Sequence, residues 1–365
     1  MKTFWHDLPK PFFVLAPMEA VTDVVFRHVV AKAGRPDVFF TEFTNATGWH
    51  RAGNKAIGGR LIKTDDEHPI VAQLWGSNPE AMVALSQHCA QLGYDGIDLN
   101  MGCPDQSAVK AGGGAGMIRT PELAYEMITA AKASGLPVSV KTRLGYSRVD
   151  EWRDWLGGLL RQDIAVLTIH LRTKKEMSKV PAHFELIPEI RTLRDEIAPD
   201  TLLVINGDVR DRAHGLEFYE QYGVDGVMIG RGIFTNPFCF TATQRDVIIN
   251  REHLQPDASA ESTSSERHLQ PTSSPLRTRG GSGAKPSEDE ADEAIAQNNL
   301  ISLLHFHLDE YDKYSEQTGR PFETLKRFFK IYIRDFPGAS ELRDHLMHTK
   351  TTEEVRIVLA EYIAK

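Results

Sequence analysis

Cys103 is a cysteine on a predicted loop, where its thiol could take part in a reaction. It follows a candidate strand that ends near Asn100, in the segment DLNMGCP (98–104), so we expect it on the loop after that strand. A loop thiol is a nucleophile or, if its pKa stays near the unperturbed value of about 8.5, a general acid that donates a proton at neutral pH. A third interpretation is an inert loop cysteine. Cys89 and Cys239 fall in predicted helices, where we expect them to pack in the interior.

Lys141 and His170 also end apolar runs. A lysine ammonium pairs with an anion or with charge delocalised over a ring, and an imidazole donates a hydrogen bond to the same ring. The plainer interpretations are a lysine whose ammonium reaches solvent and a histidine that is hydrogen-bonded at the rim of the fold. If Lys141 and His170 lie on the same face of the fold, contacts to a bound ring or anion are the favoured interpretation.

A glycine-rich segment follows another apolar run, in GVMIGRG from Gly226 to Gly232. Glycines leave backbone N–H groups exposed, and such groups bind phosphate where a strand runs into a helix, which we expect to begin near Asn236. Arg231 adds a charged donor for the same anion. The alternative is a tight turn with an exposed arginine. We expect a second segment of the same phosphate site at the end of the preceding strand, formed by Asn206, Gly207 and Asp208.

These residues need a scaffold that brings the ends of several strands together. Before residue 251, short runs rich in Val, Ile and Leu alternate with helical segments, as parallel βαβ units require. Eight such units predict an α/β fold, a (β/α)8 TIM barrel whose functional side chains lie at the C-terminal ends of the strands. Helices are predicted to start at Asn78-Pro79, Thr120-Pro121 and Asn236-Pro237. The eight candidate strands end near Ala16, Phe40, Gln73, Asn100, Lys141, His170, Ile205 and Ile229.

Composition divides the chain into three parts. Residues 252–294 are rich in Ser, Pro, Gly and acidic residues, so they cannot bury enough apolar surface to offset the entropy of ordering. We therefore predict a barrel domain over 1–251, a disordered acidic linker over 252–294 and a small all-helical C-terminal domain over 295–365. Segments of that last domain carry apolar residues at helical spacing.

A basic face is predicted on one helix of the C-terminal domain, over 322–335. Lys326, Lys330 and Arg334 recur every four residues with Arg327 beside them, while apolar residues follow another stripe of the helix. Such a face suits contacts to nucleic-acid phosphates, which weaken steeply with added salt. The alternative is an ordinary solvated helix face.

Composition also excludes several classes of protein. The 365 residues carry a formal charge of −8 and are 41% hydrophobic and 25% charged, which argues against a uniformly basic nucleic-acid binder. Three cysteines are too few for a disulfide scaffold. The N-terminus lacks a signal-peptide pattern, no run reaches the length of a membrane span, and the histidines lack metal-ligand partners. We expect a cytoplasmic monomer with no metal site.

The motifs along the barrel resemble those of the bacterial-type tRNA-dihydrouridine synthases, FMN-dependent enzymes with a barrel followed by a helical domain. The sequence departs from the family's usual pattern at Leu171, where glycine is usual, and at His183-Phe184, where Asp-Trp is usual. The resembling segments follow the family's order: APMEAVTD (16–23), TEF (41–43), QLWGSNPEAM (73–82), GYDGIDLNMGCP (93–104), GGGAGMI (112–118), PVSVKTRLGY (137–146), IHLRT (169–173), INGDV (205–209) and DGVMIGRG (225–232).

The resemblance implies a function and a role for each matching residue. The implied reaction reduces the C5–C6 bond of specific uridines in tRNA, with NADPH as reductant and FMN as cofactor. Hydride would go to C6, and Cys103 would protonate C5. Pro17 and Met18 would line the flavin, and Asn100 and Arg143 would border the flavin and the target base. The flavin ring would contact Gln73, Lys141 and His170. The ribityl chain and phosphate would be held by Asn206, Gly207, Asp208, Gly230 and Arg231. For a tRNA substrate, the basic face predicted over 322–335 would supply phosphate contacts from Lys326, Arg327, Lys330 and Arg334.

The residues leave three alternatives open. A flavin-dependent reductase of a free pyrimidine or another small enone would use the same cysteine chemistry, but it has no need of a basic helix face. A flavin-free isomerase or lyase would use Cys103 as a nucleophile on a phosphorylated substrate. An RNA-binding module without catalysis has no need of Cys103 and Lys141.

Overall fold

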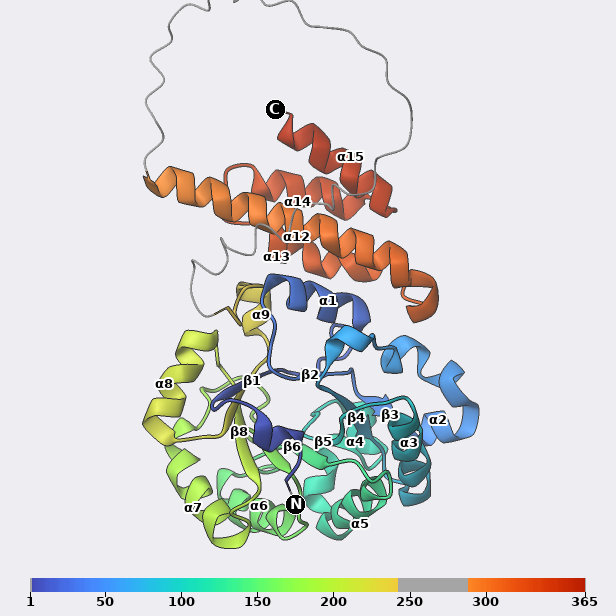
Figure 1. The fold of residues 1–365 in the computed structure, drawn as a ribbon, viewed down its shortest axis with the longest axis vertical. Coiled ribbons are helices and arrows are strands. Elements are labelled where there is room, and N and C mark those ends of the chain that lie inside the picture. Colours follow the sequence, from blue (N-terminus) through green and yellow to red (C-terminus); the bar gives the residue numbers. More distant parts are fainter. Residues whose placement is uncertain (1, 242–287, 365) are drawn as a thin grey trace, which may run out of the picture.

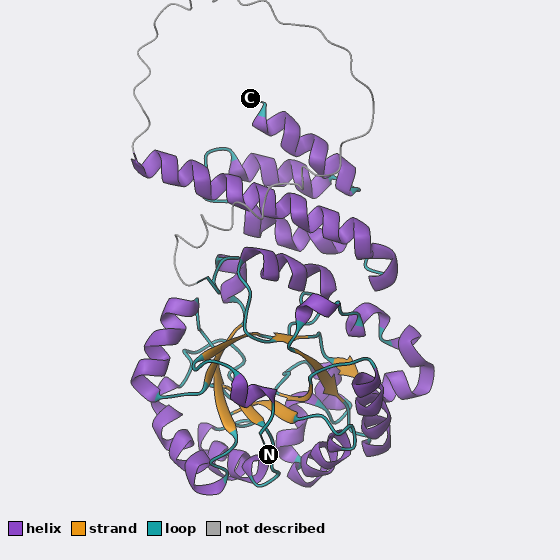
Figure 2. Cartoon of the chain, in the orientation of Figure 1, coloured by secondary structure: helices purple, strands orange, loops and turns teal. Residues whose placement is uncertain are grey.

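The computed structural model describes residues 2–241 and 288–364 (Figure 1). Within them, eight parallel strands form a ring with helices outside it (Figure 2). The predicted barrel class is therefore confirmed, and each predicted strand end lies within two residues of the observed one. A short extra strand, β3 (Thr44–Asn45), pairs with the end of β4. The strands of the ring are β1 (Phe12–Leu15), β2 (Phe39–Phe40), β4 (Ile70–Trp75), β5 (Gly96–Met101), β6 (Val138–Arg143), β7 (Val166–His170), β8 (Leu202–Asn206) and β9 (Gly226–Ile229).

Hydrogen bonds between parallel neighbours close the ring. The strand order is β1-β9-β8-β7-β6-β5-β4-β2, and a parallel bridge between Val14 and Val38 joins β1 to the segment before β2. The register places Asn100 opposite Lys141, and His170 opposite Asn206. Because the C-terminal ends of parallel strands share one rim, these polar side chains meet there.

Alternation along the strands gives the barrel an inner and an outer core. Phe12 and Val14 belong to the inner cluster, whereas Phe13 and Leu15 pack with the surrounding helices. Trp5, which is 1% exposed, packs on Phe12 near the N-terminal ends of the strands, with the ring centroids 5.6 Å apart. The interior of the barrel is therefore filled with side chains, so a binding site has to lie at one of its two ends.

Two of the three predicted helix starts are confirmed. α3 begins at Pro79 after Asn78, whose side chain accepts the Ala81 N–H, and α5 begins at Pro121. The third prediction is wrong, because Asn236 follows the end of α9 and its side chain accepts the Phe238 N–H within a turn. Such a turn competes with a helix cap. The helices of the barrel are α1 (Val24–Ala33), α2 (Ala46–Ala52), α3 (Pro79–Gln91), α4 (Gln106–Lys110), α5 (Pro121–Lys132), α6 (Trp152–Leu160), α7 (Ile187–Ile197), α8 (Arg212–Tyr222) and α9 (Gly232–Thr235).

The C-terminal helices stack against α1 and α9 of the barrel (Figure 1). α12 begins at Glu288, inside the range 252–294 that the sequence predicts as a linker, because EDEADEA is rich in the helix formers Glu and Ala. The predicted linker over 252–287 and the predicted end of the barrel domain over 242–251 lie outside the described residues. None of the helices in the described part of the chain has the length and apolar composition that a bilayer crossing needs. The C-terminal helices are α12 (Glu288–Thr318), α13 (Phe329–Tyr332), α14 (Ala339–His348) and α15 (Thr352–Ile363).

The predicted continuous helix over 322–335 is wrong. The chain forms a 3₁₀ helix over Phe322–Phe328, and then α13, which ends at Tyr332. Packing explains the break, because five of the six residues from 328 to 333 are buried. A single face of an α-helix cannot bury so many consecutive residues. The basic residues of this segment therefore do not form one helix face.

Candidate active site at the barrel mouth

A cavity of about 650 Å³ opens at the C-terminal rim of the barrel. Its walls come from the ends of β1, β6, β7, β8 and β9 and from the loops that follow them. This volume is in the range of cofactor and small-molecule sites. The predicted residues in its lining are Pro17, Met18, Lys141, His170, Asn206, Gly207, Asp208, Gly230 and Arg231.

A second cavity, of about 800 Å³, lies at the opposite end of the strands beside Phe4, Pro137 and Ala165. In (β/α)8 barrels that end contributes stability, whereas the loops at the C-terminal rim carry function. Among residues 2–241 and 288–364, no three His, Cys, Asp or Glu side chains gather in a way that could hold a metal ion. The convergence of polar side chains from separate strands therefore places the candidate site at the rim.

Lys141 and Asn206 form a polar pair in the wall of the rim cavity. The Lys141 ammonium donates to Oδ1 of Asn206 at 3.1 Å, and Nδ2 of Asn206 donates to the carbonyl of Met228 at 2.9 Å. These bonds fix the orientation of the Asn206 amide. Burial, together with the nearby Arg143 guanidinium, lowers the pKa of Lys141 to about 8. An anionic or electron-rich ring in the cavity would stabilise the charged ammonium.

Burial keeps His170 neutral, and Arg172 fixes which of its ring nitrogens carries the proton. Burial, followed by the cations Arg143 and Lys141, lowers the pKa of His170 far below its ordinary value, so the ring is neutral at pH 7. Nη1 of Arg172 lies 3.1 Å from Nε2 of His170, and a guanidinium only donates hydrogen bonds. Nε2 is therefore the acceptor, and the ring proton is on Nδ1. His170 is a neutral donor through that atom.

Arg172 also binds Asp208, at the start of the loop after β8. Burial raises the pKa of Asp208, but Arg172, the Ala182 N–H and Arg231 together lower it, so the carboxylate is ionised. Its Oδ1 lies 3.5 Å from Nη2 of Arg231, whose side chain is 67% exposed. Two guanidinium groups against one carboxylate leave a net positive charge here. Such a wall suits an anionic group.

Gln73 and Asn100 are buried beside the cavity and lie outside its lining. Nε2 of Gln73 donates to Asp98 at 2.7 Å, Ser139 Oγ donates to the same carboxylate at 2.6 Å, and Asn100 Nδ2 donates to Oε1 of Gln73 at 3.0 Å. Burial raises the pKa of Asp98 to about 6. Asp98 therefore orients the side-chain amide of Gln73, which in turn orients that of Asn100. The predicted flavin and base contacts of Gln73 and Asn100 stay predictions.

Cys103 is half-buried at the end of this network. Asn100 Oδ1 accepts the backbone N–H groups of Gly102 and Cys103 at 3.1 and 2.9 Å. Burial raises the pKa of the Cys103 thiol, so it is protonated at neutral pH. Gly114 has φ of +54°, and a Cβ there would lie 2.7 Å from the Cys103 carbonyl oxygen. The 3₁₀ helix Gly114–Arg119 therefore begins in close contact with Cys103, and the protonated thiol lies on a loop that is held in place.

Arg143 connects two loops and lies outside the lining of the cavity. Its Nε donates to the Gly102 carbonyl at 2.7 Å, and its Nη1 donates to the carbonyls of Thr173 and Met177 at 3.0 and 2.9 Å. Its side chain is buried. Arg143 therefore ties the Cys103 loop to the loop after β7, and its predicted contact with a flavin or a base stays a prediction.

Several residues of the site escape the sequence analysis. Arg172 controls two candidate residues, and Ser178 and Arg210 line the cavity. The sequence does contain a feature that points to Arg172, because it lies in IHLRT, two residues after the histidine that ends a strand. Ser178 and Arg210 lie in loops whose path depends on tertiary contacts, so spacing alone gave no signal for them.

The four basic residues predicted to contact RNA lie in different settings. Lys326 donates to a carbonyl within the C-terminal domain, whereas Arg327 and Arg334 donate to carbonyls of the barrel. Lys330 is exposed, and it makes no hydrogen bond or ion pair with the residues that the structure describes. Contact with RNA stays a prediction for all four.

Comparisons with known proteins show the family of this chain. The family model described as "Dihydrouridine synthase (Dus)" matches residues 14–284. Over 365 residues the chain is 53% identical to "Probable tRNA-dihydrouridine synthase 2" of Bacillus subtilis strain 168, covering 100% of this chain and 98% of that protein. It is 51% identical, with 100% and 97% coverage, to "Probable tRNA-dihydrouridine synthase" of Staphylococcus aureus strain Mu50. This chain belongs to the dihydrouridine synthase family.

Proposed function

We propose that this protein reduces the C5–C6 bond of uridines in tRNA, with FMN as cofactor and NADPH as reductant. The observation that carries the proposal is a cationic cavity at the barrel rim with a protonated thiol on the neighbouring loop. Family membership and the names of the relatives support tRNA as the substrate class.

The residues of the cavity fit FMN. A Cβ at Gly230 would meet only the Cβ of Ala16, at 3.5 Å, so the backbone there leaves room for a close ligand. Arg231 and the wall around Asp208 provide the positive charge that a phosphate needs. Lys141 and neutral His170 supply a cation and a donor for the ring system.

FMN held by these residues would, in its reduced form, supply a hydride for C6 of the uracil ring. Hydride addition gives the ring enolate character, which a positioned acid must quench. Cys103 serves as that acid because its thiol is protonated at neutral pH and its loop is held through Asn100 and Gly114. The proton goes from Sγ to C5, and solvent returns a proton to the half-buried thiolate. Lys141 stabilises negative charge that develops beside it.

The substrate base has to leave its stack to reach the rim, which costs a few kcal/mol. Phosphate contacts that offset this cost need exposed cations, and Lys330 in the C-terminal domain is one. The loops at the barrel mouth add Lys110, Lys175 and Lys179, all exposed. A tRNA substrate also supports a cytoplasmic location, and we expect the protein to act as a monomer.

The test measures bound flavin and the product. Purified protein should carry or take up FMN, seen as a yellow absorbance band. With NADPH and an unmodified tRNA transcript it should form dihydrouridine, detected by mass spectrometry of digested RNA. Equal turnover on free uridine would favour the small-pyrimidine reductase, and a protein that stays colourless in the presence of FMN would refute the proposal.

A further inference from the structure

The barrel and the C-terminal domain share a packed interface. Phe26 of α1 stacks on Phe328 with the ring centroids 4.7 Å apart. Near the end of α12, a Cβ at Gly59 would lie 2.6 Å from the Cα of Thr318, so backbone meets backbone there. The end of α12 is therefore held against the barrel.

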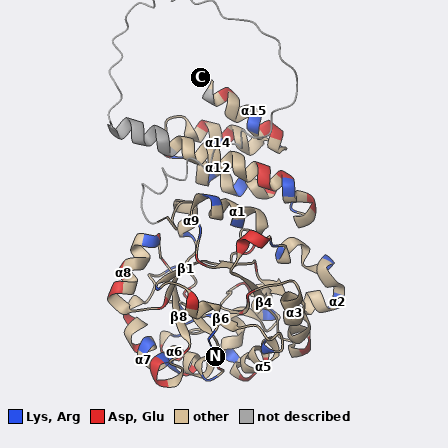
Figure 3. Cartoon of the chain, in the orientation of Figure 1, with Lys and Arg blue, Asp and Glu red and all other residues tan. Residues whose placement is uncertain are grey.

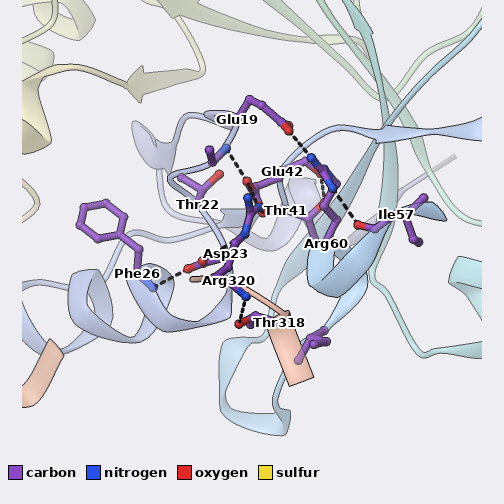
Figure 4. A network of polar contacts seen from close by, with 12 residues as sticks. Glu19, Thr22, Asp23, Phe26, Thr41, Glu42, Ile57, Arg60, Thr318 and Arg320 are labelled. Atoms are coloured by element: carbon purple, nitrogen blue, oxygen red, sulfur yellow. Dashed lines mark hydrogen bonds and ion pairs between the residues drawn. The ribbon is translucent and has the colours of Figure 1, made fainter. Parts of the chain in front are cut away.

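Arg320 follows the end of α12 and reaches a buried carboxylate of the barrel (Figure 4). Its Nη2 donates to both oxygens of Glu42 at 2.7 and 2.6 Å, and its Nε lies 3.9 Å from Oδ2 of Asp23. Glu42 is 0% exposed. A buried carboxylate is strongly destabilising without a cation. Arg320 of the C-terminal domain is the cation that is hydrogen-bonded to it.

Glu42 in turn holds the loop that follows β1. Its Oε1 accepts the backbone N–H of Ala20, and Arg327 of the C-terminal domain donates to the Ala20 carbonyl at 2.9 Å. Ala20 has φ of +58°, a conformation that is costly for a residue with a Cβ unless its surroundings hold it. The backbone N–H and carbonyl of Ala20 are thus both hydrogen-bonded by residues of the domain interface.

Ala20 belongs to a closed turn that contains Met18. The N–H groups of Val21 and Thr22 donate to the Met18 carbonyl at 3.1 and 3.0 Å, and Thr22 Oγ1 accepts the Met18 N–H at 3.0 Å. Met18 and its neighbour Pro17 line the rim cavity. The contacts therefore run without a break from Arg320 through Glu42 and Ala20 to the cavity wall.

Arg334 provides an independent second contact. It donates to the carbonyl of Thr235 at the end of α9, and Thr235 and Asn236 also line the cavity. Two loops of the cavity wall, after β1 and after β9, are thus bound by arginines of the C-terminal domain.

We infer that the C-terminal domain shapes the cofactor cavity, with Arg320 as a positioning residue that acts through Glu42 on the turn 18–22. The inference rests on the proposed function only for the identity of the cofactor. Without Arg320, buried Glu42 would lie near the charge of Asp23 with no hydrogen bond from this arginine, and the turn would lose its anchor. The domain is then a part of the cofactor site as well as a surface for RNA.

The first experiment compares Arg320→Met with Arg356→Met in the full chain. Arg356 pairs with Asp309 and Asp312 at 2.8 Å within the C-terminal domain, so it controls for the loss of an arginine in that domain. Titration with FMN, followed by flavin fluorescence, should give a dissociation constant about ten-fold higher in Arg320→Met, and nearly unchanged in Arg356→Met. Parental affinity in Arg320→Met would overturn the inference.

A second substitution separates positioning from a general loss of folding. Glu42→Gln removes the buried charge and keeps an oxygen for the Ala20 N–H. The double variant Arg320→Met, Glu42→Gln should therefore recover most of the FMN affinity, whereas additive losses would overturn the route through Glu42. If Arg320→Met does not fold, Arg320→Lys takes its place. An intermediate affinity supports the inference, and a parental one contradicts it.

Hydrogen–deuterium exchange of the FMN-free proteins gives a readout that is independent of the cofactor. The peptide over 17–23 should exchange faster in Arg320→Met than in the parent or in Arg356→Met, because its anchor is lost. Unchanged exchange would contradict the inference. If the parent protein takes up no FMN, the proposed function fails, and the exchange result still decides the coupling between the domains.

Discussion

The barrel rim and the C-terminal domain use their charged residues in different ways. At the rim, Lys141, His170 and Asp208 surround a shared cavity, and each is oriented by a neighbouring polar group. In the C-terminal domain, Arg320 and Arg334 bind the barrel itself. Figure 3 shows basic and acidic residues interspersed over the helices of both regions. In the C-terminal domain, an arginine therefore does not by itself indicate a ligand, whereas Lys141 and Asp208 at the rim line one cavity.

The largest expected effect tests the chemistry of the rim. Cys103→Ala should lower the rate of dihydrouridine formation by about 10²–10⁴-fold, because the general acid is lost. FMN affinity should stay unchanged, since Cys103 is not in the cavity lining. Cys89→Ala is the matched control: Cys89 is fully buried in the core, so this variant should lose stability and keep its turnover per folded molecule. Parental turnover in Cys103→Ala would exclude the acid role.

The next effect tests the cationic wall of the cavity. Arg231→Met should raise the dissociation constant for FMN about 10- to 100-fold, because a hydrogen bond between charged groups is lost. Riboflavin, which lacks the phosphate, should bind both proteins equally. Arg191→Met is the control, since Arg191 donates to the Tyr222 carbonyl away from the rim. Equal losses for FMN and riboflavin would show that Arg231 does not contact the phosphate.

A third effect tests the burial of Lys141 through pH. Its folded pKa of about 8 lies below the ordinary value of 10.5. Below pH 8 the ammonium is charged in both states, and the fold carries the cost of burying it. Between pH 8 and 10.5 the unfolded chain binds the proton more tightly, so the free energy of unfolding relative to Lys141→Met should rise by about 1–3 kcal/mol. Urea unfolding of the two FMN-free proteins measures this difference. A difference in unfolding free energy that does not change between pH 8 and 10.5 would contradict the lowered pKa of Lys141.

The smallest effect tests whether the C-terminal domain also uses charge on a ligand. Lys330→Glu should weaken tRNA binding a few-fold at low salt and reduce the salt dependence by about one ion. Lys132→Glu, at the opposite end of the barrel, should leave tRNA binding unchanged. Filter binding at several salt concentrations distinguishes the two variants. Identical affinities in both would remove Lys330 from the RNA surface.

The sequence by itself determined the barrel and the make-up of its rim. Alternating apolar runs and helix caps such as Asn78 predicted the strands and many of the helices, because short-range periodicity and capping act locally. In a parallel barrel, the place of a residue along its strand decides at which end it lies. The sequence therefore predicts that Lys141, His170 and Asn206 share one rim, and all three line the cavity there.

Only the tertiary structure decided which groups touch. Arg172 sets the His170 tautomer, and Arg320 neutralises Glu42, through contacts that no local pattern encodes. The helix expected over 322–335 breaks at Tyr332 because burial of successive residues outweighs helix propensity, which is worth only a few tenths of a kcal/mol per residue. Buried charges and packed aromatic rings choose their partners across the whole chain, so their positions depend on the complete fold.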